Sequence, residues 1–403
     1  SIEEEGVQID NVKLVDQGEL REAELLVLLA SGPYPARNPA QNLADLKAQI
    51  AANEKGVQEL HKMVAHFGLD LVQAYMHHVQ DNAEESVRRV ITRLKDGQFT
   101  LPLDNGAQIC VAIRVDAAQR SAVIDFTGTS AQLDNNFNAP TAVCMAAVLY
   151  VFRALVDDDI PLNAGCLKPL QVIIPPGSML NPNPPAAVVA GNVETSTCIT
   201  NALLGALGVM AASQCTMNNF TFGNERYQYY ETVSGGSGAG EGFAGTSVVQ
   251  THMTNSRLTD PEVLEFRFPV RLDSYEIRPD SGGAGRWRGG LTSRRTYRVG
   301  FEEATVTAAG ERGQAAPEGY FGGLAGGLFE CRIVSPDGTE RTMPSKGATE
   351  IVHLGDRVLL QPAGSGGYGD PKERAVASIE ADLLDGYITI EAARSLYGYQ
   401  GSI

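Results

Sequence analysis

The sequence predicts an α+β protein with an N-terminal helical region, a mixed α/β central core, a β-rich C-terminal part and a short helical tail. Three observations support this fold class. Apolar residues recur with helical spacing through the first hundred residues, and short apolar segments separated by turn residues follow from residue 98 onward. Glycine, at 43 of 403 residues, gathers in clusters that indicate tight turns and close backbone approach. We place the four regions at 1–97, 98–275, 276–370 and 371–403.

The N-terminal region carries the signals of successive helices. Asn38 followed by Pro39 suits a helix N-cap and the first helical position. Apolar residues then recur at i, i+3, i+4 and i+7 in two sets: Leu60, Met63, Val64 and Phe67, and Val87, Val90, Ile91 and Leu94. Gly97 is expected to end the last of these helices.

Strand and helix patterns alternate in the core, and strands dominate after it. In the core we expect strands at 99–103, 109–115, 122–126 and 170–174, and helices at 141–156 and 196–212. Later strands are expected at 227–233, 264–269, 293–299, 304–309, 329–334 and 357–361. Two short helices, 375–384 and 390–397, are expected in the tail. This mixture favours an α+β arrangement over a regular doubly wound sheet.

Charge and hydropathy argue against two classes of partner. The chain has 48 acidic and 32 basic residues, a net charge of −16, so it repels phosphate backbones and anionic membranes. Its longest apolar stretch, 142–155, contains Arg153 and is shorter than the roughly 20 residues of a membrane span. The first residues, Ser-Ile-Glu-Glu-Glu, do not resemble a signal peptide. We expect a cytoplasmic protein without a nucleic-acid or membrane partner.

The six cysteines do not form a recognisable motif. No two have the CxxC spacing of a zinc ribbon or a thioredoxin-type site. Cys215 has no basic neighbour in the sequence that could lower its thiol pKa, which disfavours cysteine nucleophilic catalysis.

Asparagine, threonine and glycine concentrate between residues 134 and 262. Short donors and acceptors on a constrained backbone suit the binding of a ligand that bears carbonyl and amide groups. The same residues also serve ordinary turns and caps, and this alternative stays open. The candidate substrate-binding residues are Asn136, Asn138, Asn192, Thr195, Asn218, Asn219 and Asn255.

Three titratable residues of this zone are candidate catalytic groups. His252 lies among polar residues, where it could act as a general acid or base or as a structural hydrogen-bonding group. Glu194 and Glu231 are carboxylates in uncharged surroundings, so a raised pKa or a bracing role is expected of each. The glycine-rich loop 235–240 lacks the lysine of a Walker motif and is expected to be a flexible loop beside a site.

At this zone the sequence resembles the hydantoinase B family, which includes the hydrolytic subunit or domain of ATP-dependent 5-oxoprolinase. The matching stretches are residues 42–53, 125–129, 136–140, 161–166, 191–196, 217–219, 229–231, 252–255, 259–265 and 281–283. So many matches in the same order make the resemblance specific. The substrate is less specific, because relatives include hydantoin amidohydrolases, other lactamases and acetone or acetophenone carboxylases.

The resemblance implies a two-component, hetero-oligomeric enzyme. A hydantoinase A-like ATPase partner phosphorylates the amide oxygen of a cyclic amide, such as 5-oxoproline or a related lactam or hydantoin. The subunit resembled here then completes ring opening, which requires an activated water, oxyanion donors and a dry pocket. Two alternatives are a carboxylase-type subunit and a non-catalytic assembly subunit.

The resemblance also implies a divalent metal. Family members have a further N-terminal stretch with a His-His-x-Asp motif, which this sequence lacks. Glu3 aligns with the third-ligand position of the metal-containing carboxylase branch, and a carboxylate is acceptable to Mn²⁺ or Zn²⁺. Acidic residues at a chain start are also commonly solvated. If Glu3 is a ligand, the remaining ligands are expected from another polypeptide that carries the missing stretch.

Overall fold

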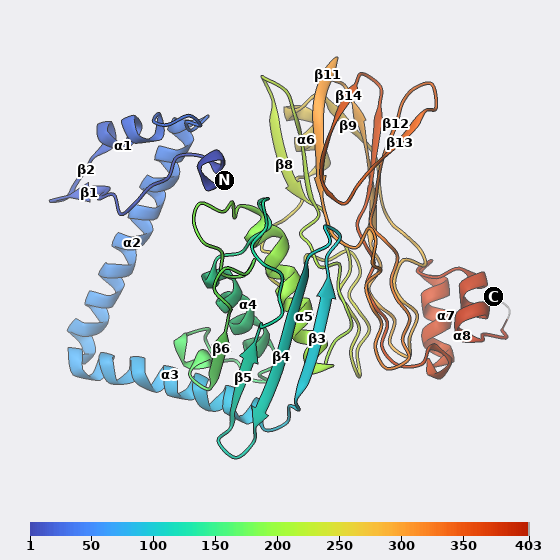
Figure 1. The fold of residues 1–403 in the computed structure, drawn as a ribbon, viewed down its shortest axis with the longest axis horizontal. Helices are drawn as coiled ribbons and strands as arrows, with labels where there is room; N and C mark the ends of the chain where they lie inside the picture. The colour runs from blue at the N-terminus through green and yellow to red at the C-terminus, as the bar shows by residue number, and fades with distance from the viewer. Residues whose placement is uncertain (402–403) are drawn as a thin grey trace.

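A computed structural model of the chain describes residues 1–401. Helices make up 32% and strands 23% of it, which confirms the α+β prediction. Figure 1 shows a helical arm at the N-terminus, an α/β body, a stack of two antiparallel sheets and two C-terminal helices. None of the helices in the described residues is long and apolar enough to cross a membrane.

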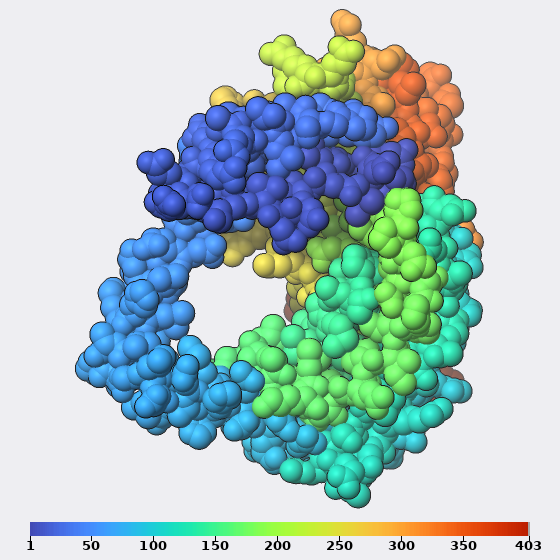
Figure 2. Space-filling view, turned by 60° about the vertical axis from the view of Figure 1, so that its left-hand side comes forward, coloured from blue at the N-terminus to red at the C-terminus, as the bar shows by residue number. Residues whose placement is uncertain are grey.

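The N-terminal arm contains the successive helices predicted for the first hundred residues. After the short helix η1 (Ile2–Glu5) and the strands β1 (Val15–Asp16) and β2 (Glu19–Leu20) come α1 (Glu22–Leu29), α2 (Pro39–Phe67) and α3 (Leu69–Ile91). The Asn38 side chain accepts a hydrogen bond from the Gln41 N–H, so the predicted cap forms. Only Leu43 of the 29 residues of α2 is buried. The second half of α3 buries Ala83, Val87 and Ile91 in the body. Figure 2 shows an opening between the arm and the body.

The body is built on a four-stranded sheet in the order β3-β4-β5-β6. Its strands are β3 (Gly97–Pro102), β4 (Gln108–Asp116), β5 (Ser121–Asp125) and β6 (Leu170–Ile173). Helices α4 (Thr141–Ala154) and α5 (Ser196–Leu207) contact each other, and α5 covers β3 and β4. Helix α5 is shorter than predicted because Gly208 adopts the left-handed conformation, at φ 65°, and ends it.

Two antiparallel sheets form the C-terminal part. One has the order β14-β11-β7-β8 and the other β13-β12-β15-β10-β9. The strands are β7 (Asn219–Gly223), β8 (Gln228–Thr232), β9 (Val270–Ile277), β10 (Ser293–Val299), β11 (Glu303–Ala309), β12 (Glu330–Val334), β13 (Glu340–Met343), β14 (Lys346–His353) and β15 (Arg357–Gln361). Strands β7 and β8 lie within the predicted core, 98–275, and β9 begins within it, yet all three pair with strands of this part. A shared core containing Phe220, Phe222 and Tyr297 lies between the sheets.

The strand predicted at 264–269 is wrong, because this segment forms helix α6 (Pro261–Arg267). The Asp260 carboxylate accepts hydrogen bonds from the N–H groups of Glu262 and Val263, and Pro261 occupies the first helical position. Capping therefore outweighs the alternating pattern. The chain becomes extended at Phe268 and enters β9 at Val270. The predicted tail helices are confirmed as α7 (Val376–Leu384) and α8 (Ile390–Tyr397).

Candidate functional site

Glu194 lies in a single π-helical turn, Gly191–Thr195, that leads directly into α5. Such turns are rare and are frequent at functional sites. Gly191 is required here because a Cβ at this position would lie 2.5 Å from the carbonyl oxygen of Asn138. The turn is thus pressed against the 133–139 loop, and the Glu194 side chain points into the protein with 1% of its surface exposed.

Three side chains contact the Glu194 carboxylate: a lysine of β14, the first residue of β7, and a threonine that precedes β7. Lys346, the first residue of β14, places its Nζ 2.9 Å from Oε2. Asn219, the first residue of β7, donates through Nδ2 to Oε1 at 2.6 Å, and the Thr216 hydroxyl also donates to Oε1. Lys346 forms a second ion pair, at 2.6 Å, with Glu311, which follows β11. We call Glu194, Thr216, Asn219, Glu311 and Lys346 the Glu194 cluster.

The cluster holds two buried carboxylates and one ammonium that is largely, but not fully, buried. Burial raises the pKa of Glu194 to about 7, and Lys346 only partly opposes this effect. Burial would lower the pKa of Lys346, but Glu194 and Glu311 outweigh it and raise that pKa, so the lysine stays charged. One positive charge between two carboxylates leaves Glu194 able to take up or release a proton near neutral pH.

A hydrogen bond links the cluster to the surface. The Tyr230 hydroxyl donates to Asn219 Oδ1 at 2.6 Å, and the Tyr230 side chain is 51% exposed. Burial of the ring, together with the Glu194 charge, raises the pKa of Tyr230, so the phenol stays protonated. Glu194, Asn219 and Tyr230 thus form a continuous path from the buried carboxylate to the outer face of the sheet.

That outer face carries a polar groove of about 700 Å³, within the size range of small-molecule sites. Hydroxyl-bearing residues lie opposite one another across four strands, in the order Tyr230, Thr221, Thr307 and Thr349. Arg37, from the arm, lines the same groove and hydrogen-bonds Gln228 of β8. Hydroxyls and a guanidinium suit a ligand rich in carbonyl or phosphoryl oxygens.

Several predicted binding residues hold the 133–139 loop, which packs against the π-helical turn of Glu194. The Thr195 hydroxyl donates to the Phe137 carbonyl at 2.6 Å, and the Phe137 ring lies 4.6 Å from Lys346 Nζ. Asn138 is fully buried and bonds only backbone groups of residues 133, 135 and 187, so it shapes this loop. The Asn136 carbonyl accepts from the Ala190 N–H at 3.0 Å.

The other predicted asparagines lie outside the cluster. Asn218 is buried with φ 50°, and its amide donates to the Val233 carbonyl at 2.9 Å, which ties the start of β7 to the end of β8. Asn192 and Asn255 are exposed. Only Asn219 among the predicted binding residues contacts the Glu194 carboxylate through its side chain.

Glu231 lies on the opposite face of the sheet from the cluster. It pairs with Phe220, whereas Tyr230 pairs with Thr221, and successive residues of a strand point to opposite faces. Its carboxylate contacts the hydroxyls of Tyr297 and Tyr229 and lies 3.5 Å from Arg295 Nε inside the two-sheet core. The arrangement favours the bracing role for Glu231 over the catalytic one.

His252 lines a separate cavity of about 470 Å³ between α4 and the 235–252 segment. Its Nε2 lies 2.8 Å from Ser213 Oγ, and its Nδ1 lies 3.4 Å from the Tyr150 hydroxyl. Desolvation lowers the pKa of His252 to about 4, so the ring is neutral at pH 7. No hydrogen bond among the described residues joins His252 directly to the Glu194 cluster.

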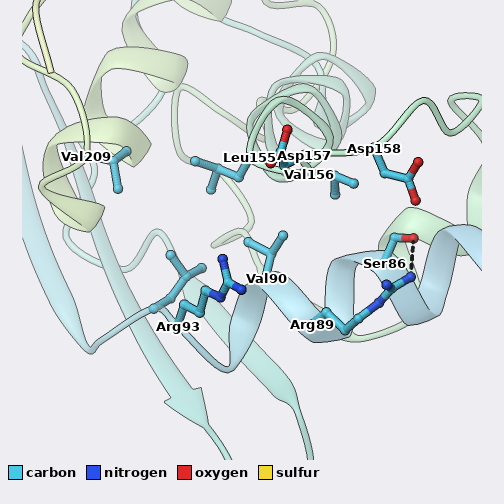
Figure 3. Close-up of a pocket in the computed structure, with 10 residues that line it drawn as sticks. Ser86, Arg89, Val90, Arg93, Leu155, Val156, Asp157, Asp158 and Val209 are labelled. Carbon is cyan, nitrogen blue, oxygen red and sulfur yellow. Dashed lines mark hydrogen bonds between the residues drawn. The ribbon is translucent and has the colours of Figure 1, made fainter. Parts of the chain in front are cut away.

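A third pocket, of about 420 Å³, lies where the end of α3 faces the end of α4 (Figure 3). Its lining includes Arg89, Arg93, Asp157 and Asp158, so it carries charge of both signs. Arg89 donates to the Ser86 hydroxyl at 3.2 Å, as Figure 3 shows. This third pocket and the His252 cavity are both lined by Leu155 and Val209.

Comparison with known proteins identifies the family. Residues 1–371 match the family described as Hydantoinase B/oxoprolinase. This chain belongs to the hydantoinase B/oxoprolinase family. It is 39% identical to the 5-oxoprolinase of Dictyostelium discoideum over 378 residues, covering 92% of this chain and 29% of that protein. It is also 39% identical to 5-oxoprolinase 1 of Arabidopsis thaliana over 395 residues, covering 92% and 31%. The chain thus spans less than a third of the length of these relatives.

Two solved structures resemble this hydantoinase B-family chain. The ATP-dependent caprolactamase from Pseudomonas jessenii superposes with a TM-score of 0.83 at 25% identity, covering 99% of this chain and 72% of that one. Nucleotide-free acetone carboxylase superposes with a TM-score of 0.81 at 15% identity, covering 97% and 61%. The second similarity shows a shared fold only.

Glu3 lies in η1, exposed, and its carboxylate has no hydrogen-bond partner among residues 1–401. The neighbouring Glu5 is engaged, since it accepts from the N–H groups of Val188 and Val189 at 2.6 and 2.8 Å. No group of three or more His, Cys, Asp or Glu side chains that could hold a metal exists in the described residues.

Sequence reasoning missed Lys346, Glu311, Thr216 and Tyr230. Lys346 lies 152 residues from Glu194, and nothing in its immediate sequence distinguishes it from an exposed strand lysine. Tyr230 lies inside the matching stretch 229–231 and Thr216 directly precedes 217–219, so these stretches were the available signal. The partners of a buried carboxylate are set by sheet pairing, which brings β7, β11 and β14 together.

Proposed function

We propose that this chain is the ring-opening component of an ATP-dependent cyclic-amide hydrolase. An ATPase partner of hydantoinase A type would phosphorylate the amide oxygen of 5-oxoproline or a related lactam or hydantoin. The 5-oxoprolinase relatives and the caprolactamase fold support this reaction class. The observation that carries the proposal is the Glu194 carboxylate, which titrates near pH 7 and is connected through Asn219 and Tyr230 to a polar groove.

The groove would bind the activated amide, and Tyr230 would orient the attacking water. Because its hydroxyl proton is donated to Asn219, the Tyr230 oxygen is free to accept a hydrogen bond from water in the groove. Ionised Glu194 strengthens this acceptor through the Asn219 amide. Water then adds to the amide carbon, the C–N bond breaks and the nitrogen takes a proton. A second water releases the phosphate as inorganic phosphate.

The hydroxyls of the groove would stabilise the negative charge that develops on oxygen. Thr221, Thr307 and Thr349 lie beside Tyr230 in register, and Arg37 supplies a positive charge at the edge. For Mn²⁺ or Zn²⁺, we propose only that the exposed Glu3 contributes one ligand, with the others from a polypeptide that carries the His-His-x-Asp stretch. No step of the proposed reaction is assigned to the metal.

The test reconstitutes this chain with a hydantoinase A-type ATPase and a polypeptide that carries the His-His-x-Asp stretch. Tyr230→Phe is expected to lower ring opening by about 10-fold, and Glu194→Gln, which acts through Asn219 and Tyr230, by a similar factor, while ATP hydrolysis by the partner continues. Tyr75→Phe, a change in an exposed tyrosine of α3 outside the groove, is the matched control and should behave as wild type.

Wild-type ring opening in Glu194→Gln would overturn the proposed role of the cluster. Bicarbonate-dependent consumption of a ketone, in place of lactam opening, would identify a carboxylase-type subunit. Absence of turnover with any partner would favour an assembly subunit.

A further inference from the structure

The His252 cavity lies outside the Glu194 cluster and its groove, and the proposed reaction does not use it. We propose that this cavity binds an uncharged cyclic amide, with the Tyr150 hydroxyl donating a hydrogen bond to the amide oxygen. This inference rests on the proposed function for the compound class, and it adds a site, a recognition residue and a preference among lactams.

The lining of the cavity suits a small, uncharged, partly polar ligand. Its volume of about 470 Å³ is in the range of small-molecule sites. None of the described residues that line it is Asp, Glu, Lys or Arg, and His252 is neutral at pH 7. The apolar part of the wall includes Leu204, Met210 and Phe243, and polar groups come from Tyr150, Ser237, Thr246, Gln250, Thr251 and His252.

A chain of hydrogen bonds behind the wall sets the direction of the Tyr150 hydroxyl. Ser213 Oγ is fully buried and accepts from the Gly238 N–H at 3.2 Å. Its own proton has one acceptor within reach, His252 Nε2 at 2.8 Å. If His252 instead donated from Nε2, the buried serine proton would be unpaired, at a cost of about 1–3 kcal/mol. His252 therefore carries its proton on Nδ1.

The proton on Nδ1 determines what Tyr150 can offer to a ligand. Nδ1 lies 3.4 Å from the Tyr150 oxygen, which therefore accepts from the imidazole. The tyrosine proton remains available for an acceptor in the cavity. Tyr150 lies on α4, where the rigid helix fixes its position. A hydroxyl that can donate a hydrogen bond inside a mostly apolar cavity suits a ligand that carries a carbonyl oxygen.

The backbone of the wall adopts costly conformations that favour a binding role. Val248 and His252 have φ angles of 50° and 53°, a region that non-glycine residues, and β-branched residues above all, rarely adopt. They flank residues 249–251, which line the cavity. Gly238 can approach Ser213 only because it has no side chain, since a Cβ there would lie 1.8 Å from the Ala211 carbonyl oxygen. Strain of this kind concentrates at ligand sites.

The absence of charge on the described lining predicts discrimination between lactams. A carboxylate that enters the cavity loses water without gaining a cationic partner, which is unfavourable. The pocket formed around Arg89 and Arg93 shares only Leu155 and Val209 with this cavity, so its arginines do not line the cavity (Figure 3). An unsubstituted lactam is therefore preferred over 5-oxoproline, which has the same five-membered ring with a carboxylate.

The test is ligand-observed NMR on the full chain with 2-pyrrolidinone, the unsubstituted five-membered lactam, and with 5-oxoproline. We expect 2-pyrrolidinone to bind at least 10-fold more tightly than 5-oxoproline. Ala154→Trp places an indole at the exposed rim of the cavity and should abolish binding, whereas Ala146→Trp, at an exposed position of the same helix outside the lining, should not change it. Tyr150→Phe should weaken binding about 10-fold, the loss of one hydrogen bond.

Three results would each overturn the inference: no binding of 2-pyrrolidinone, binding that survives Ala154→Trp, or equal affinity for 5-oxoproline. Because the readout is binding and needs neither ATP nor a partner, it separates the two proposals. Cavity binding without reconstituted ring opening would count against the proposed function alone. Ring opening that is unaffected by Ala154→Trp, with no cavity binding, would count against this inference alone.

Discussion

Glu194 and His252 are desolvated titratable side chains whose pKa values shift in opposite directions on folding. Burial raises the pKa of Glu194 from 4.5 to about 7, so the folded chain holds that proton more tightly than the unfolded chain. Desolvation lowers the pKa of His252 from 6.5 to about 4, so the folded chain holds that proton less tightly. Each difference corresponds to about 3 kcal/mol of stability at its limit.

The two residues therefore offset each other in the pH dependence of stability. The Glu194 contribution is fully present below about pH 4.5 and is lost as pH rises to about 7, whereas the His252 contribution is fully present above about pH 6.5 and is lost as pH falls to about 4. Relative to wild type, Glu194→Gln should gain stability as pH rises between 4.5 and 7, and His252→Gln should lose stability as pH rises between 4 and 6.5. Urea unfolding at successive pH values measures both differences, and parallel curves for all three proteins would contradict this prediction.

At the scale of elements, sequence patterns predicted helices and strands better than they predicted the site. Caps and periodicity identified α2, α4 and the tail helices, because these signals are local. The misassigned strand, which forms α6, came from reading apolar alternation without giving weight to the Asp260–Pro261 cap. The predicted helix end at Gly97 is also wrong, because α3 ends at Ile91 and Gly97 begins β3. Local chemistry thus explains both the successes and the misassigned strand.

The site was only partly predictable because its contacts are long-range. Glu194 and Asn219 were identified from their uncharged, amide-rich surroundings, and they do contact each other. Lys346 and Glu311 were not identified, since their role depends on sheet pairing. Glu231 and Asn138 lie in the same kind of uncharged, amide-rich sequence as Glu194 and Asn219. In the structure, however, Glu231 braces the two-sheet core and Asn138 braces a loop. Local sequence composition cannot distinguish a site residue from a bracing residue. The face of the strand on which a residue lies and its contacts in the fold can distinguish them.

Helices α2 and α5 are expected to differ strongly in local stability. Only Leu43 of α2 is buried, whereas ten of the twelve residues of α5 are. Amides of the middle of α2, residues 45–62, should exchange hydrogen about 1,000-fold faster than those of α5, because opening α2 exposes little apolar surface. Hydrogen exchange followed by mass spectrometry measures both helices in one experiment. Equal protection would show that α2 is covered in solution.

At the scale of the whole molecule, the arm returns to the body, so that arm and body surround the opening seen in Figure 2. Glu5 accepts from the N–H groups of Val188 and Val189, and the Ile2 N–H donates to the Pro185 carbonyl at 2.9 Å. On the other side, Arg37 hydrogen-bonds Gln228 at the polar groove. Arg37 therefore links the arm to the lining of the polar groove in which the proposed reaction takes place.

Removing the Glu5 contact should let the arm open. Glu5→Ala deletes the acceptor of two backbone N–H groups near the surface, a loss of about 1 kcal/mol that raises the open population roughly fivefold. Spin labels at the exposed positions Val27 of α1 and Phe266 of α6 report the distance between arm and two-sheet stack. Glu3→Ala is the matched control, because the Glu3 carboxylate has no hydrogen-bond partner in the described chain. A broader, longer distance distribution in Glu5→Ala alone is expected, and identical distributions would mean that the arm is held by other contacts. Since Arg37 moves with the arm, the same variant should also weaken ligand binding in the groove.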